Sequence, residues 1–108
     1  MDGERRIFER FSAQFPAKFK DSRNPFGSNV FLQDASASGA RFISSERLFS
    51  GDFVSLQVKL PHMPNPLELS GRIMWSRPSR SSMWETGLRF VEANFMKIQP
   101  IFKSTLQD

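Results

Sequence analysis

Two arginines near the N-terminus are the first residues whose type and spacing could do chemistry. Arg6 and Arg10 are four residues apart in the stretch RRIFER that begins at Arg5. This spacing brings two side chains to one face of a helix, or to one side of an extended chain. The two guanidiniums can therefore converge on one anionic ligand, because each planar fork grips a phosphate or a guanine edge. A solvated basic arm is the alternative explanation.

A carboxylate and a hydroxyl follow in the segment DASASG, which spans residues 34–39. Asp34 and Ser36 have the same parity at the end of an expected strand, so their side chains point the same way. Gly39 permits a positive φ and a tight return into the next strand. The carboxylate and the hydroxyl could accept hydrogen bonds from the N1–H and the exocyclic amine of a guanine. The alternative is an ordinary Asp/Ser turn that closes a hairpin.

A third group of candidates combines aromatic and basic residues. Trp75 opens the segment WSRPSR, and Trp84 and Arg89 follow it along the chain. An aromatic ring beside an arginine can stack on a nucleic-acid base. Trp75 also continues the apolar alternation of the segment before it, and this pattern favours a position in the core.

Enzymatic and metal chemistry find little support in the residue types. Asp34, Ser36 and the single histidine His62 are the right types for a Ser-His-Asp triad, but no Gly-x-Ser-x-Gly nucleophile elbow is present. The chain has no cysteine, which excludes disulfides and thiolate metal sites. It also has no phosphate-binding loop and no dinucleotide fingerprint. We therefore expect no enzymatic activity, no metal and no cofactor.

A length of 108 residues is that of one domain with a single core. Fifteen Lys and Arg residues against eleven Asp and Glu residues give a net charge of +4, which admits an anionic partner. No apolar run is long enough for a membrane helix, and the first ten residues lack the apolar core of a signal peptide. We expect a cytoplasmic protein without membrane insertion, with a flexible arginine-rich arm at residues 1–10 and one domain at 11–108.

Apolar residues at every second position predict short strands through most of the chain. The expected strands span residues 11–19, 29–35, 40–44, 53–60, 67–75 and 86–91, with turns or loops at 21–27, 36–39, 50–52, 61–66 and 76–85. Pro16 lacks a ladder donor, so an edge position or a bulge is expected there. Six short strands that follow one another with turns or short loops between them are typical of a small barrel or sandwich.

The period of the apolar pattern changes near the C-terminus. Spacings of three and four residues separate Phe95, Ile98, Phe102 and Leu106, and they predict an amphipathic helix. Asn94 is the expected N-cap. Pro100 is expected to mark either the start of this helix or a kink in it.

Taken together, the arginine pair and the segment at 34–39 resemble the signature of PilZ domains, which bind the bacterial second messenger cyclic di-GMP. Arg6 and Arg10 match its R-x-x-x-R part, and after 23 intervening residues Asp34, Ser36 and Gly39 match its D-x-S-x-x-G part. The residues before Arg6 look like the usual E-R-R opening, and the segments 71–75 and 87–90 resemble later strands of the family. The resemblance covers about residues 4–106.

The resemblance implies an all-β fold, a small six-stranded antiparallel β-barrel with a C-terminal α-helix and an arginine arm that folds over the ligand. The resemblance also implies ligand roles for the matching residues. Arg6 and Arg10 would contact guanine Hoogsteen edges and phosphates, and Arg5 would assist them. Asp34 and Ser36 would hold another guanine edge, and Gly39 would shape the turn. Secondary candidates for ligand contact are Arg41, Trp75 and Arg89.

The resulting hypothesis is a cyclic di-GMP receptor whose N-terminal arm changes conformation on binding and signals to a protein partner. One alternative is a PilZ-like protein–protein adaptor that does not bind nucleotide, although such members typically lack the arginine motif. Another is a small barrel that binds single-stranded nucleic acid. The carboxylate of Asp34 disfavours the last alternative because it would repel phosphates, so nucleic acid is not an expected partner.

Overall fold

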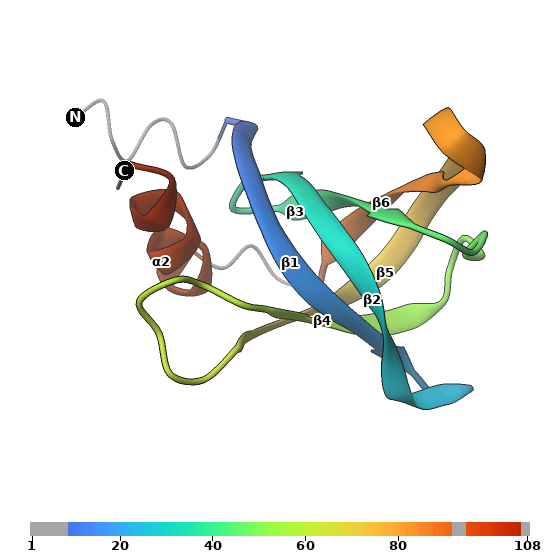
Figure 1. Cartoon of the computed structure of the whole chain (residues 1–108), viewed down its shortest axis with the longest axis horizontal. Helices are drawn as coiled ribbons and strands as arrows, with labels where there is room; N and C mark the ends of the chain where they lie inside the picture. The colour runs from blue at the N-terminus through green and yellow to red at the C-terminus, as the bar shows by residue number, and fades with distance from the viewer. Residues whose placement is uncertain (1–8, 92–94, 107–108) are drawn as a thin grey trace.

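Six strands close into one antiparallel barrel, and a C-terminal helix covers one end of it (Figure 1). The computed structural model describes residues 9–91 and 95–106. The strands are β1 (Phe11–Asp21), β2 (Asn24–Ala35), β3 (Gly39–Ser44), β4 (Phe53–Val58), β5 (Leu67–Pro78) and β6 (Trp84–Phe90). A short 3-10 helix, η1 (Arg80–Ser82), joins β5 to β6, and the helix α2 spans Phe95–Thr105. The expected all-β barrel with a C-terminal helix is confirmed.

The strands follow the order β1-β2-β3-β6-β5-β4 around the barrel, and pairing between β4 and β1 closes it. Apolar side chains at alternate positions of these strands point inward and form the core. Its large, fully buried members include Leu32, Phe42, Leu56, Leu69 and Ile73. Burying each such side chain stabilises the fold by about 1.5–3 kcal/mol, so the alternation in the sequence fixes which face of each strand turns inward.

Two hairpins extend further than the polar composition of their tips predicts. The expected turn at 21–27 contracts to two residues, because Asp21 pairs with Asn24 across the hairpin and its carboxylate accepts from the backbone N–H groups of Arg23 and Asn24. The expected loop at 76–85 likewise contracts, because Pro78 pairs with Trp84. Few apolar residues alternate at these tips, and Phe26 at the first of them is exposed. The alternation that marks a strand is therefore lost although the pairing continues.

Pro16 lies where the pairing of β1 with β4 ends. The backbone N–H of Lys59 donates to the Pro16 carbonyl at 3.0 Å. Proline has no N–H with which to return this bond, and the regular pairing between the two strands begins one residue later, at Ala17 and Val58. The expected edge position or bulge is therefore not found: Pro16 pairs with Phe31 inside the β1–β2 ladder, and its missing N–H falls at the end of the β1–β4 ladder.

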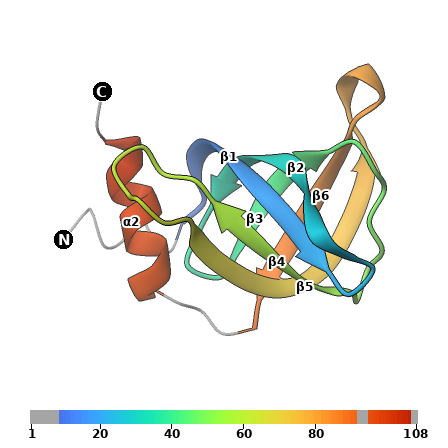
Figure 2. The ribbon, with the colours of Figure 1, turned by 60° about the horizontal axis from the view of Figure 1, so that its bottom comes forward.

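The helix α2 packs its apolar face against β1 and the open end of the barrel (Figure 2). Ile98 and Ile101 are fully buried, and the ring of Phe102 meets that of Phe11 edge-on at 5.0 Å. Leu106, predicted to lie on the apolar face, is exposed instead because the helix ends before it. No helix in the described part of the chain is long and apolar enough to cross a membrane.

Pro100 lies inside α2 and does not mark its start. A proline at this position removes the hydrogen bond to the carbonyl four residues earlier. That carbonyl belongs to Met96, an exposed residue in the first turn of the helix, where water can replace the missing donor. The expected N-cap, Asn94, lies outside the described residues.

Three β-bulges change the phase of the alternation. One extra residue lies between Ser12 and Phe15 in β1, one between Leu32 and Asp34 in β2, and one between Ile73 and Trp75 in β5. A bulge sets two residues against one on the neighbouring strand, so residues beyond it exchange the inner face for the outer one. The prediction that Trp75 lies in the core is therefore wrong: Ile73 is buried, and Trp75 points outward with 37% of its surface exposed.

Candidate functional site

The bulges align one outward-facing row across five strands. Ser12 of β1 lies opposite Asp34 of β2, which lies opposite Arg41 of β3. Arg41 in turn lies opposite Gly87 of β6, and Gly87 lies opposite Trp75 of β5. Residues separated by up to 63 positions in the chain (75 − 12) thus become neighbours on one surface. This row includes Asp34 of the predicted site and two of its secondary candidates.

Asp34 lies at the centre of an arginine cluster. Only 6% of the residue is exposed, and each carboxylate oxygen has its own guanidinium partner. Arg10 donates to Oδ1, and Arg41 lies with Nη2 at 2.6 Å from Oδ2. Arg10 belongs to the first predicted motif and Asp34 to the second, so the structure brings the two motifs into direct contact.

Ser36 holds the turn between β2 and β3. Its backbone N–H donates to the Gly39 carbonyl at 2.8 Å, and its buried hydroxyl lies 3.1 Å from the hydroxyl of Ser38. The exposed side chain of this turn is Ser38, which sequence reasoning did not select. The described contacts of Ser36 therefore stabilise the turn that follows Asp34.

Gly39 is required for a different reason from the one predicted. The glycines with positive φ are Gly27 and Gly51 among the described residues, so Gly39 has an ordinary backbone conformation. A Cβ at Gly39 would overlap the backbone carbonyl of Leu88 on the neighbouring strand β6. The glycine thus permits the close approach of β3 and β6 at the point where the turn ends.

A hollow of about 250 Å³ lies beside this turn. The polar residues Arg10, Ser38 and Arg89 line it, together with Trp75. Gly87 also lines the hollow, and a Cβ there would overlap the indole of Trp75. The glycine therefore lets the indole lie across β6. Sequence reasoning missed Gly87, although a glycine inside an expected strand is itself a sign that another group approaches closely.

The predicted site residues are not all placed in the same way. Four of them line the hollow: Arg10, Gly39, Trp75 and Arg89. Asp34 does not line it but forms an ion pair with Arg10, which does, and Arg41 forms an ion pair with Asp34. Arg5 and Arg6 lie outside the described residues, so the first arginine of the R-x-x-x-R motif has no described position. Within residues 9–91 and 95–106, no group of three or more His, Asp or Glu side chains could hold a metal ion.

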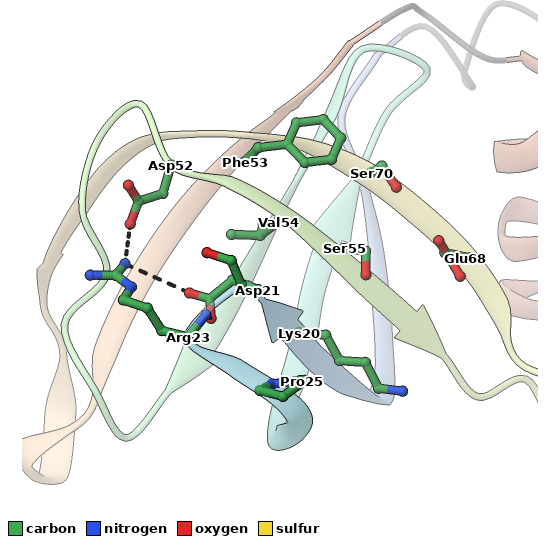
Figure 3. A pocket seen from close by; sticks show the side chains of 11 residues that line it. Lys20, Asp21, Arg23, Pro25, Asp52, Phe53, Val54, Ser55, Glu68 and Ser70 are labelled. Carbon is green, nitrogen blue, oxygen red and sulfur yellow. Dashed lines mark hydrogen bonds and ion pairs between the residues drawn. The ribbon is translucent and has the colours of Figure 1, made fainter.

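A second hollow, of about 540 Å³, lies at the turn between β1 and β2, away from α2 (Figure 3). Arg23 points across it to the carboxylate of Asp52 and, at 3.7 Å, to that of Asp21. None of the predicted site residues lines this hollow. Its larger volume does not make it the better candidate, because Arg10 and Gly39 of the two sequence motifs line the smaller hollow instead.

Solved structures share this fold. The PilZ domain of YcgR from Escherichia coli with cyclic di-GMP has a TM-score of 0.69 at 17% identity, over 93% of this chain and 90% of that one. The PilZ domain of CeSA from a cellulose-synthesizing bacterium has a TM-score of 0.62 at 18% identity, over 88% and 92%. The Bacillus subtilis inhibitor of motility MotI/DgrA has a TM-score of 0.67 at 16% identity, and this chain covers 47% of it.

At these identities the structural similarity establishes the fold alone. No curated protein matches the chain. The family model for the PilZ domain, however, matches residues 4–99, which include both motifs and all six strands. The chain belongs to the PilZ domain family.

Proposed function

We propose that the chain is a cyclic di-GMP receptor and that its ligand binds at the hollow beside Arg10, Trp75 and Arg89. PilZ domains form a family of cyclic di-GMP receptors, and the neighbouring YcgR structure is described with this ligand. The observation that carries the proposal is the direct contact between Arg10 and Asp34. This contact brings the family's two motifs together beside a hollow that is lined by arginines and a tryptophan.

The chemistry of the site matches the chemistry of the ligand. Cyclic di-GMP has two negative phosphates and two guanines. Arg10 and Arg89 supply exposed guanidiniums, which pair with phosphates or with the N7 and O6 edge of guanine. Trp75 supplies a partly exposed indole, and stacking of a base on such a ring contributes about 1–3 kcal/mol.

A guanine can reach the buried carboxylate of Asp34 if one of its two arginines moves aside. Arg10 is the more exposed of the two, with 54% of its side chain accessible against 34% for Arg41. We expect Arg10 to move from Asp34 to the ligand, while Arg41 keeps its position on the other oxygen. The freed oxygen then accepts from the guanine N1–H or its amine, and Arg10 gains a phosphate or a guanine edge.

We further propose that binding orders residues 1–10 as an arm over the barrel and that a protein partner reads the resulting surface. The support is the position of Arg10, which directly precedes β1, and the packing of Phe11 on Phe102 of α2. A change at Arg10 therefore occurs one residue from the contact between the barrel and its helix. No chemical change of the ligand is part of this proposal.

Calorimetric titration with cyclic di-GMP tests the proposed site. Arg10→Ala and Asp34→Ala should each weaken binding by about tenfold to a hundredfold, because each removes a charge-assisted hydrogen bond of about 1.5–3 kcal/mol. Lys59→Ala is the matched control, since it removes one exposed positive charge at a position that does not line this hollow.

Two further titrations, with GMP and with single-stranded DNA, separate the remaining alternatives. Weak binding of GMP with tight binding of cyclic di-GMP supports the receptor. Binding of DNA in preference to cyclic di-GMP would favour the nucleic-acid-binding barrel. A folded wild-type protein that binds none of these ligands would favour an adaptor that works without nucleotide.

A further inference from the structure

Glu85 links two parts of the proposed site that have no described contact with each other. It lies on the outer face of β6, opposite Arg77 of β5, and 15% of its side chain is exposed. Oε2 accepts from Nη1 of Arg41 at 3.0 Å, and Oε1 accepts from Nε of Arg77 at 2.7 Å. Both carboxylate oxygens are thus occupied by arginines from the two flanking strands.

On one side, Glu85 acts on the carboxylate that is proposed to read guanine. The guanidinium of Arg41 bridges Glu85 and Asp34, while its Nε is buried without a hydrogen-bond partner among the described residues. The two carboxylates therefore supply the described polar contacts that orient this guanidinium. Without Glu85, Arg41 would have one anchor instead of two, and its hold on Asp34 would loosen.

On the other side, Glu85 acts on the ring that is proposed to stack on a purine. Arg77, which Glu85 holds, lies with its guanidinium carbon 4.8 Å from the centre of the Trp75 ring. Such a cation–π contact fixes the ring only as long as the cation itself is held in place. Most of the Arg77 side chain is exposed, so its contacts with Glu85 and with the ring are the described contacts that limit its motion.

We infer that Glu85 is a positioning residue of the cyclic di-GMP site, holding Arg41 on Asp34 and Arg77 on Trp75; this rests on the proposed function. Electrostatics alone makes the opposite prediction for its removal. Among Arg10, Asp34, Arg41, Arg77 and Glu85 the net charge is +1, and Glu85→Gln raises it to +2. A ligand with two negative charges should then bind more tightly, unless Glu85 is needed to orient its neighbours.

The test is calorimetric titration of Glu85→Gln with cyclic di-GMP. Glu68→Gln is the matched control. It makes the same change of charge at an exposed position of β5 that does not line the hollow beside Arg10 and Trp75. We expect binding to weaken by about tenfold in Glu85→Gln, the effect of one lost charged contact, and to stay at the wild-type value in Glu68→Gln. Wild-type or tighter binding by a folded Glu85→Gln variant would overturn the inference.

A measurement without ligand distinguishes failure of this inference from failure of the proposed function. In a Trp84→Phe background, Trp75 is the remaining tryptophan. Glu85→Gln should increase the quenching of its fluorescence by acrylamide, because Arg77 is released from the ring. Unchanged quenching would contradict the link between Glu85 and Trp75, even if the wild-type protein proved not to bind cyclic di-GMP.

A second variant keeps the test valid if Glu85→Gln does not fold. Arg77→Lys preserves the charge but loses the planar fork that engages Glu85 and covers the ring, and the side chain lies largely in solvent. It should raise the acrylamide quenching of Trp75 and weaken cyclic di-GMP binding about threefold or more. Wild-type values for both quantities would overturn the inference.

Discussion

At the scale of single residues, the site depends on side chains whose role follows from their neighbours rather than from their type. Arg10 and Arg41 are both arginines on Asp34, yet Arg10 is largely exposed and Arg41 is also held by Glu85. The exposed arginine is free to exchange partners, whereas the doubly held arginine can act as a fixed support. Residue type alone could not distinguish these two roles.

Gly87 offers a test of the proposed stacking role of Trp75. Gly87→Ala would place a Cβ where the indole now lies, so the ring must move away from β6. We expect cyclic di-GMP binding to weaken by about fivefold to a hundredfold, the value of a base–aromatic stack. The acrylamide quenching of Trp75 should rise in the same variant.

Gly87→Ala should destabilise the fold as well as displace Trp75, so a control is needed that destabilises the fold alone. Gly51→Ala is this control. Gly51 has a φ of 93°, and a Cβ there would meet nothing within 4 Å. The substitution therefore destabilises the fold through backbone strain, by about 1 kcal/mol or more, without crowding Trp75. Equal loss of affinity in both variants would show that Gly87→Ala acts through stability and that Trp75 has no direct part in binding.

At the scale of elements, the strands and the helix were predictable because apolar residues recur at every second position in most strands and at every third or fourth position in the helix. Val54, Leu56 and Val58 alternate without interruption and form β4 as expected. The β-bulges were not predictable, because an extra residue in a strand is decided by the register with its neighbour. For this reason Trp75 was predicted to be in the core. The pairing of Glu85 with Arg77 was not foreseen because both residues fall in the loop expected at 76–85.

The two motifs of the candidate site were identifiable in the sequence, but their geometry was not. Arg10 and Asp34 match the family's spacing, and they do meet. The hollow, however, also needs Gly87, which lies beside the motif residues only because β3 and β6 are neighbours. Pairing between distant strands depends on the closure of the whole barrel, and no local pattern encodes it.

Amide hydrogen exchange tests the proposal that residues 1–10 become ordered over the barrel when the ligand binds. Binding of cyclic di-GMP should slow amide exchange in residues 4–12 and 34–39, because several strong contacts must offset an ordering cost of about 1–2 kcal/mol per residue. The segment 67–69, at the start of β5, lies outside the hollow and should change much less. Protection spread evenly over the barrel, or an arm protected equally without ligand, would contradict a local switch.

At the scale of the whole molecule, the barrel and the helix share one core. Ile98 and Ile101 of α2 are as fully buried as Leu56 of β4, so neither part can lose its partner without exposing apolar surface. We expect thermal unfolding in a single transition, with the helical circular dichroism signal and the tryptophan emission changing together. A helical signal that is lost at a lower temperature would show that α2 detaches from a stable barrel.

The closure of the barrel also limits how another protein can recognise it. Each of the six described strands has a neighbour on both sides, so unpaired strand edges remain only where a strand extends beyond its neighbour, as residues 24–30 of β2 do beyond the pairing with β3. Strand addition, by which many domains capture an extended peptide, requires such a free edge. We expect a partner that senses the ligand-bound state to bind through side chains, loops or the helix, because no strand has an edge that is free along its whole length. The same closure protects the domain against edge-to-edge aggregation.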